Sequence, residues 1–190
     1  MRTAGKPATT QVILEAARRL IAERGVAAVS LQDVADAAAV SKALIHYHFV
    51  DRETLLARLV DSTAGALVAR ERDALRTAQG VSAVDALWAW LEAELGRGDI
   101  RVLLAVSQDR APRVQEAAHA AATLRLEVAA ETIERLFAML GLAPRVPSPL
   151  LAGTVVAFVD GLAFDAPLVP ERPARASFDV FWLAMLGLAE

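Results

Sequence analysis

Apolar residues recur every three to four positions along nearly all of this 190-residue chain, which is the spacing of amphipathic helices. No stretch alternates apolar and polar residues as a half-buried strand does. We therefore predict an all-α fold of about nine helices without internal repeats. The expected helices cover 10–24, a short stretch after Ser30, another after Ser41, then 52–77, 82–97, 99–108, 112–140, 149–164 and 176–189.

Residues that start or stop helices stand at these expected boundaries. Gly25 can end the first helix, and Ser30 can cap the second with Asp33 at its third position. Ser41 and Asp51 can cap the third and fourth helices. Further boundaries are expected at residues 79–80, at Ser82, at Pro112 and at residues 148–149. We predict two domains, a small N-terminal head over residues 1–51 and a helical body over residues 52–190.

The composition excludes several classes of site. The chain has no cysteine, which excludes disulfides, cysteine-ligated zinc and thiol nucleophiles. Two of its three histidines are spaced i, i+2, which spreads them around a helix, so we expect no metal site. Because the chain has neither a glycine-rich phosphate loop nor a Ser/His/Asp set, we expect no cofactor and no enzyme.

The sequence also bears on location and charge. The first residues lack the apolar core of a signal peptide, and the longest uncharged run, residues 146–159, is too short to span a bilayer. We therefore expect a cytoplasmic protein. Residues 1–60 hold eight basic and six acidic residues, a net charge of +2, whereas the remainder holds 12 basic and 17 acidic residues, a net charge of −5. A basic head on an acidic body fits a nucleic-acid partner for the head.

The short helix expected after Ser41 has two different faces. Ile45 and Phe49 are four residues apart and are expected to face the interior. Two short helices joined by a tight turn are the arrangement that enters a DNA major groove. A solvated face of an ordinary helix bundle is the alternative. The face opposite the apolar pair carries Lys42, Ala43, His46 and Tyr47, which, with His48 and Arg52, can reach bases or phosphates.

Several motifs in this region match a known family at fixed spacing. They are ILEAARRLI at 13–21, ERG at 23–25, SLQDVA at 30–35, AAVSK at 38–42, YHF at 47–49 and RETLL at 52–56. Residues 10–56, about a quarter of the chain, thus resemble the N-terminal DNA-binding domain of the tetracycline-repressor (TetR) family of bacterial transcriptional regulators. The resemblance implies a variable C-terminal domain that binds a small molecule and dimerises.

By position, the resemblance also implies which residues meet double-stranded DNA. Base contacts are implied for Gln32, Lys42, Ala43 and His46. Phosphate contacts are implied for Ser30, Ser41, Tyr47, His48 and Arg52.

The chain departs from the family pattern at four positions. Ala39 replaces a usual turn glycine, and a left-handed turn there would cost about 1 kcal/mol with a Cβ. Ala43 replaces another small or turn-forming residue. Leu44 replaces a threonine, which loses a phosphate contact but permits one with a thymine methyl group. His46 replaces a tyrosine, which changes the expected operator preference.

The last two expected helices are apolar around much of their circumference, so they must be buried in a core or against a partner. The resemblance favours a four-helix interface in a homodimer, with burial inside the monomer as the alternative. Two heads about 34–36 Å apart would then bind successive major grooves of a palindromic operator. The interface residues we expect are Leu151, Val155, Leu162, Phe181, Trp182 and Met185.

A mainly apolar ligand pocket is expected between the helices at 82–97 and 112–164. Its expected lining residues are Trp90, His119, Arg125 and Phe158. Arg125 can bind an anionic ligand, but an ion pair with an acid such as Glu92 or Asp160 is the favoured alternative. We therefore predict a ligand-responsive DNA-binding transcriptional regulator, a repressor released by a small molecule. The alternative is a helical small-molecule-binding protein with a degenerate DNA-binding head.

Overall fold

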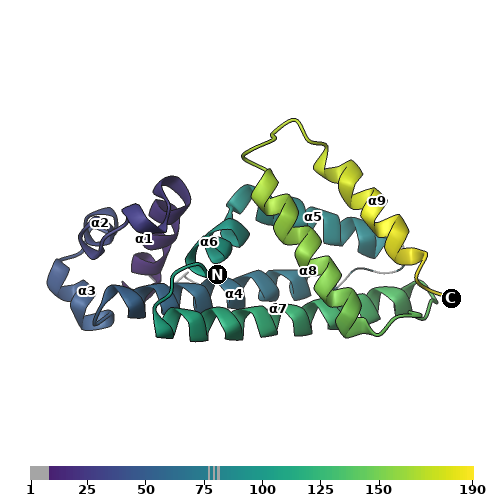
Figure 1. Cartoon of the computed structure of the whole chain (residues 1–190), viewed down its shortest axis with the longest axis horizontal. Coiled ribbons are helices and arrows are strands. Elements are labelled where there is room, and N and C mark those ends of the chain that lie inside the picture. The colour runs from purple at the N-terminus through teal and green to yellow at the C-terminus, as the bar shows by residue number, and fades with distance from the viewer. Residues whose placement is uncertain (1–8, 77, 79, 81) are drawn as a thin grey trace, which may run out of the picture. The chain divides into compact units, whose positions relative to one another are not determined.

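The computed structural model describes residues 9–76, 78, 80 and 82–190, and within them the chain is almost entirely helical (Figure 1). In the described part there are nine α-helices, a short 3₁₀ helix and a single isolated β-bridge, which confirms the predicted all-α fold. The elements are α1 (Thr9–Arg24), η1 (Val26–Ala28), α2 (Leu31–Ala37), α3 (Lys42–His48), α4 (Arg52–Arg76), α5 (Ser82–Arg97), α6 (Asp99–Val106), α7 (Pro112–Met139), α8 (Ser148–Asp165) and α9 (Ala174–Leu186).

Most of the predicted helix boundaries agree with these elements to within two residues, but the last helix differs. Helix α9 begins two residues before the predicted start and ends at Leu186, because Gly187 caps it and the chain then turns back. The backbone amide of Ala143 donates to the Glu190 carbonyl oxygen at 2.8 Å, and the amide of Arg145 donates to the Leu188 carbonyl oxygen at 2.8 Å. The predicted helix end at Thr77, the stop at Gln79 and the basic residues Arg2 and Lys6 lie outside the described residues.

The described chain divides into two compact units. The N-terminal unit contains residues 9–63 and 102–120, and the C-terminal unit contains residues 64–101 and 121–190 apart from 77, 79 and 81. Helices α4, α6 and α7 each contribute residues to both units. The division therefore falls within α4, twelve residues after the domain boundary predicted from the motifs, and the N-terminal unit gains the segment around the α6–α7 connection.

The N-terminal unit has a core built from one face of each of its short helices. Helix α1 packs on α2, and α2 packs on α3. Their inward-facing residues are nearly free of solvent exposure, which places a continuous apolar core behind α3. These residues are Ile13, Ala17, Val34, Ala35, Ile45 and Phe49.

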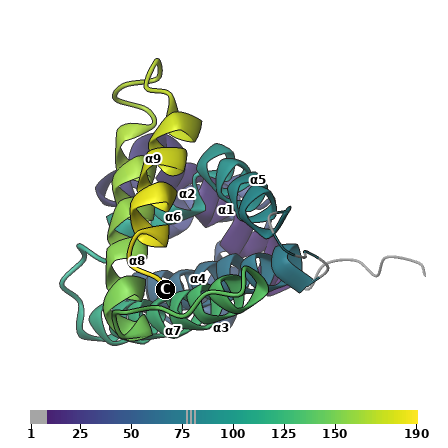
Figure 2. The same ribbon diagram turned by 90° about the vertical axis from the view of Figure 1, so that its right-hand side faces the viewer.

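In the C-terminal unit, α8 and α9 lie side by side in both views (Figures 1 and 2). The rings of Phe158 on α8 and Phe181 on α9 stack with centroids 4.0 Å apart and planes 1° from parallel. Helix α8 is, within the described residues, the one helix long and apolar enough to cross a bilayer. A core helix of a non-membrane protein passes the same test of length and composition, so this is weak evidence for a span.

A buried ion-pair cluster joins three helices of the C-terminal unit. Arg70 on α4 donates from Nε to Glu94 Oε1 on α5 at 2.6 Å and from Nη2 to Asp99 Oδ2 on α6 at 2.7 Å. The Glu94 side chain is 1% exposed and the Asp99 side chain 8%. The pKa of Arg70 is raised, chiefly by its hydrogen bonds to Glu94. The guanidinium therefore compensates two carboxylates that lie away from water.

Candidate nucleic-acid interface and ligand pocket

Helix α2 begins with the cap that the sequence predicts. The Asp33 amide donates to Ser30 Oγ at 3.2 Å, and the Ser30 amide donates to Asp33 Oδ2 at 2.9 Å, which forms a reciprocal capping box. The Ser30 hydroxyl also donates to the Asp33 carboxylate, and this is the main reason that the pKa of Asp33 is lowered. Helix α3 is capped by Ser41, whose Oγ accepts from the Leu44 amide at 3.2 Å.

The turn between α2 and α3 closes as a Schellman motif. The Val40 amide donates to the Ala35 carbonyl oxygen at 3.0 Å, and the Ala39 amide donates to the Asp36 carbonyl oxygen at 3.1 Å. This geometry needs a left-handed residue at position 39, and Ala39 has φ 54°. Ala39 is the one non-glycine residue with positive φ among the described residues, so the strain predicted for this departure from the family pattern is present.

Helix α3 turns two opposite faces in the directions that its pattern predicts. Ile45 has no exposed surface and Phe49 is 1% exposed, so both anchor the helix in the core of the N-terminal unit. The Tyr47 side chain is 81% exposed. The remaining exposed residues of this face are Lys42, Ala43 and His46. The helix thus presents a contiguous polar surface of the size that inserts into a major groove.

Other predicted DNA contacts are partly engaged within the protein. Gln32 Nε2 donates to Asp36 Oδ1 at 2.8 Å on the exposed surface of α2, a bond that can be exchanged for one with a base. His46 Nδ1 lies 3.3 Å from the Val50 carbonyl oxygen. Leu44 is half-buried, and the half-buried His48 ring has Nδ1 3.3 Å from Thr10 Oγ1. His48 therefore also helps to hold α3 on α1.

Arg52, a predicted phosphate contact, already makes hydrogen bonds within the protein. Its guanidinium donates from Nη2 to the Val26 carbonyl oxygen at 2.8 Å, from Nε to the Val29 carbonyl oxygen at 3.4 Å, and from Nη1 to Asp109 Oδ2 at 3.0 Å. Three of its five N–H donors are thus used within the protein, where Arg52 helps to hold the segment before α2. This ion pair could not be predicted from local spacing, because Asp109 lies 57 positions from Arg52.

Comparison with known proteins agrees with this geometry. Residues 13–59 match the family model described as bacterial regulatory proteins, tetR family. Residues 13–59 belong to the tetR family of bacterial regulatory proteins. This tetR-family domain contains α1 from Ile13 onward, α2, α3 and the first turns of α4, and it includes every residue of the exposed α3 face.

The whole chain also has the fold of solved transcriptional regulators, and no curated protein matches it in sequence. A transcriptional regulator from Rhodococcus sp. Rha1 is 21% identical with a TM-score of 0.77, over 96% of this chain and 98% of that one. The fatty acid degradation regulator FadR from Bacillus halodurans is 16% identical with a TM-score of 0.78, over 96% of both chains. Reduced NemR from E. coli is 16% identical with a TM-score of 0.76, over 96% of this chain and 98% of that one. At these identities the likeness concerns the fold.

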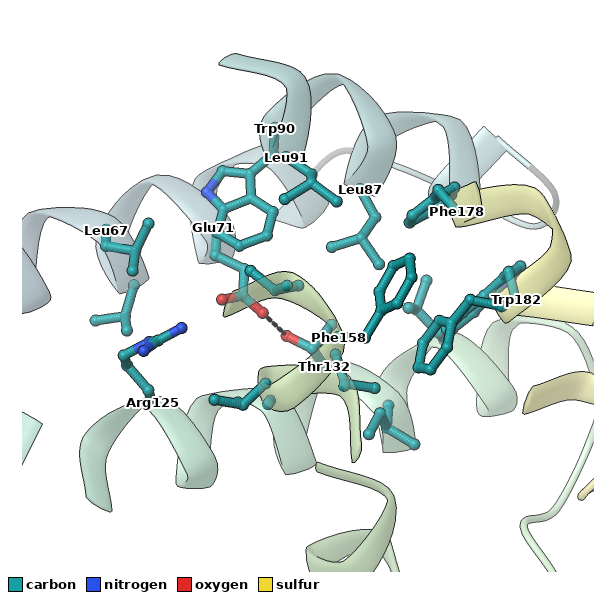
Figure 3. A pocket seen from close by; sticks show the side chains of 18 residues that line it. Leu67, Glu71, Leu87, Trp90, Leu91, Arg125, Thr132, Phe158, Phe178 and Trp182 are labelled. Atoms are coloured by element: carbon teal, nitrogen blue, oxygen red, sulfur yellow. Dashed lines mark hydrogen bonds between the residues drawn. The ribbon is translucent and has the colours of Figure 1, made fainter. Parts of the chain in front are cut away.

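A pocket lies inside the C-terminal unit, lined by residues of α4, α5, α7, α8 and α9 (Figure 3). The space between these side chains, counted with its opening to solvent, is about 660 Å³, of which about 40 Å³ can hold the centre of a water molecule. The pocket is therefore a narrow slot. Its lining is mostly apolar and aromatic, as is usual for small-molecule sites.

Three of the four residues expected at a pocket do line it, namely Trp90, Arg125 and Phe158. His119 does not line it, because its side chain is exposed on a part of α7 that belongs to the N-terminal unit. Arg125 forms the ion pair favoured as the alternative to ligand binding, with Nη2 2.5 Å from Asp160 Oδ1.

Helices α4 and α9 also contribute to this pocket, which was not predicted from the sequence. Glu71 on α4 is 8% exposed, and its carboxylate Oε1 accepts from Thr132 Oγ1 at 2.7 Å. Burial away from water raises the pKa of Glu71. A signal was available, since Leu67, Glu71 and Leu75 follow one another at four-residue spacing and place an acid within an apolar stripe. Helix α9 contributes Phe178, Phe181 and Trp182.

The residues expected at a dimer interface are mostly inside one protomer. Leu151, Leu162, Trp182 and Met185 are at most 5% exposed, while Val155 and Phe181 are half-buried and line the pocket. These six are therefore not available as the main contacts with a partner. The outward stripe of α8 consists instead of Leu150, Thr154, Ala157, Gly161 and Phe164, and that of α9 includes Val180 and Leu183.

Proposed function

We propose that this chain is a transcriptional regulator that binds double-stranded DNA through α3 and responds to a small molecule in the C-terminal unit. The observation that carries the proposal is the exposed face of α3, held outward by Ile45 and Phe49 within a tetR-family domain. Lys42 and His46 face the base edges in this arrangement, and Tyr47 reaches the phosphodiester backbone. Release from a palindromic operator on ligand binding makes the regulator a repressor.

Phosphate contacts also come from the start of each short helix. Ser30 and Ser41, which cap α2 and α3, are the proposed contacts there. Arg52 already binds Asp109 and two backbone carbonyl oxygens, so we leave it out of the proposed phosphate contacts. Lys42 thus supplies the main positive charge on the α3 face.

The proposed assembly is a homodimer formed through the outward stripes of α8 and α9. Phe164 on α8 is 63% exposed and Leu183 on α9 is 69% exposed, which is unusual for large apolar residues that follow a helical spacing. Residues 150, 154, 157, 161 and 164 alternate steps of four and three, the repeat that packs one helix against another. A second copy of the same surface covers both stripes in a two-fold arrangement.

The DNA-binding part is tested by fluorescence anisotropy with duplexes from the region upstream of the encoding gene. Lys42→Ala is expected to weaken binding and, if each Lys42 neutralises one phosphate, to reduce the salt slope by about 0.9 per protomer. Tyr47→Phe is expected to weaken binding without a change in helix content by circular dichroism. Arg145→Ala, which removes one cation from the C-terminal unit, serves as the matched control and is expected to bind as the wild type does. An equal loss of duplex affinity in Lys42→Ala and Arg145→Ala would contradict the placement of Lys42 at the DNA.

The dimer is tested by light scattering during size-exclusion chromatography. The wild type is expected at twice the protomer mass of 20.2 kDa. Phe164→Glu is expected to lower the measured mass to that of one protomer, because the dimer interface would bury a charge. Glu171→Gln, an exposed change outside the two stripes, is the control. A wild type that elutes as a single protomer at micromolar concentration would refute the dimer.

A further inference from the structure

The polar groups of the pocket gather at one end, and its aromatic rings, apart from that of Trp90, gather at the other (Figure 3). Glu71, Thr132 and Arg125 lie at the polar end, and the indole nitrogen of Trp90 is turned toward the same side. Phe158, Phe178 and Trp182 lie at the aromatic end. A molecule that fits this slot therefore has one polar end and a longer apolar part.

Trp90 brings a hydrogen-bond donor to this pocket without an acceptor. Among the described residues, the buried side-chain nitrogen and oxygen atoms that lack a partner are Trp90 Nε1 and Trp182 Nε1, and both residues line the pocket. Buried donors are almost always satisfied in folded proteins, because an unsatisfied one loses its bond to water. The Trp90 N–H at the polar end is therefore complementary to an oxygen supplied by a ligand.

The charged groups at the polar end are already compensated. Arg125 donates to both carboxylate oxygens of Asp160, at 2.5 and 3.3 Å. Glu71 accepts from Thr132, and burial favours the uncharged form of its carboxyl group. A carboxylate ligand would find the guanidinium already paired with Asp160, and an ammonium ligand would find Glu71 buried and already hydrogen-bonded to Thr132. An uncharged head avoids both costs.

We propose that the pocket binds an uncharged, largely apolar molecule whose hydroxyl or carbonyl oxygen accepts a hydrogen bond from Trp90 Nε1. The apolar part lies among Phe158, Phe181 and Trp182. A slim chain or a planar ring fits the slot better than a bulky group, given the small volume open to a water molecule. This inference rests on the proposed function only in taking the pocket as the effector site.

The effect of the head group on binding can be compared with three probes that share an eight-carbon chain. They are 1-octanol, octanoate and octylammonium. Their binding to the full chain is measured by isothermal titration calorimetry at pH 7.5 without DNA. We expect 1-octanol to bind at least tenfold more tightly than either charged probe. Tighter or equal binding of octylammonium would make Glu71 a counter-charge, and tighter or equal binding of octanoate would make Arg125 one. Either result overturns the proposal, as does the absence of binding by all three.

Trp90→Phe tests the hydrogen bond, because it removes the N–H and keeps an aromatic ring. We expect it to weaken 1-octanol binding about tenfold. Trp88→Phe is the matched control, since Trp88 is buried on the same helix and does not line the pocket, and we expect its affinity to be unchanged. Equal affinity in the Trp90 variant and the wild type would overturn the assignment of the donor. If 1-octanol binds as expected but leaves duplex affinity unchanged, this proposal stands and ligand control of DNA binding fails.

Discussion

Arg52 Nη1 donates to Asp109 Oδ2 at 3.0 Å, which ties the first residue of α4 to the connection between α6 and α7. The same guanidinium holds the carbonyl oxygens of Val26 and Val29, directly before the cap of α2. Nearby, the Arg113 amide donates to Glu53 Oε1 at 2.7 Å. The start of the DNA-binding helices and the start of α7 are thus fixed by neighbouring residues of α4 within one unit.

Replacing this guanidinium gives the first prediction. Arg52→Lys keeps the charge but loses the fork that reaches three acceptors, so we expect the free energy of unfolding to fall by about 1–2 kcal/mol. Denaturant unfolding followed by circular dichroism measures this change. Arg58→Lys, at an exposed position on the same helix, is expected to change it by less than about 0.5 kcal/mol. The salt slope of DNA binding should be unaltered in both variants; a slope reduced in Arg52→Lys would return this residue to the phosphate contacts.

The same contact predicts a dependence on acid. The pKa of Asp109 is lowered, first by the Ala111 amide and then by Arg52. A carboxyl group with a depressed pKa stabilises the fold above its unfolded value near 3.9, and this stabilisation is lost as pH falls through the folded value. The difference in the free energy of unfolding between the wild type and Arg52→Lys should therefore become smaller below about pH 4. A constant difference down to pH 2.5 would show that Asp109 does not contribute.

Ala39 is expected to be a site where a single substitution stabilises the protein. Its φ of 54° is the left-handed conformation that glycine adopts without a steric penalty. Ala39→Gly should raise the free energy of unfolding by about 1 kcal/mol, measured by urea denaturation. Ala38→Gly, one residue earlier at φ −84°, should lower it instead, by about 0.5 kcal/mol or more. A loss of stability in both variants would contradict the strain at position 39.

Glu71 is expected to destabilise the fold as its carboxyl group ionises. Its pKa is raised in the folded state by burial. The folded state therefore favours the protonated form, and stability falls as pH rises from the unfolded pKa of about 4.3 through the folded one. Glu71→Gln keeps an acceptor for Thr132 and removes the charge. The free energy of unfolding of this variant should therefore not fall as the pH rises through this range. If the free energy of unfolding changes equally with pH in the wild type and in Glu71→Gln between pH 4 and 8, the raised pKa of Glu71 is refuted.

The buried cluster around Arg70 should be sensitive to truncation. Arg70→Ala leaves Glu94 and Asp99 without their shared cation, and we expect a loss of about 3–5 kcal/mol in the free energy of unfolding. Arg76→Ala, whose partner Asp73 is exposed on the same helix, should cost less than about 1 kcal/mol. Thermal unfolding of the wild type and the two variants measures these losses in the free energy of unfolding.

Features set by neighbouring residues could be predicted from the sequence. Ser30 and Ser41 were identified as helix caps, and Ile45 and Phe49 as inward anchors, because each depends on spacings of three or four residues. The strain at Ala39 followed from the same local reasoning.

Features set by distant partners could not be predicted. Arg52 meets Asp109 across 57 positions, which no local pattern shows. Helix α8 is apolar around most of its circumference, so periodicity could not distinguish buried Leu151 from exposed Leu150. The contribution of α9 to the pocket depends on its packing beside α8, which is equally invisible in the sequence.

The proposed function depends most directly on whether the chain selects particular DNA sequences. In a selection from a random duplex library, the wild type is expected to enrich a two-fold symmetric sequence whose half-sites lie about one helical turn apart. The double variant Lys42→Ala/Tyr47→Phe, selected in parallel, should enrich none. A wild-type pool that stays as random as the starting library, while the protein remains folded by circular dichroism, would contradict the account.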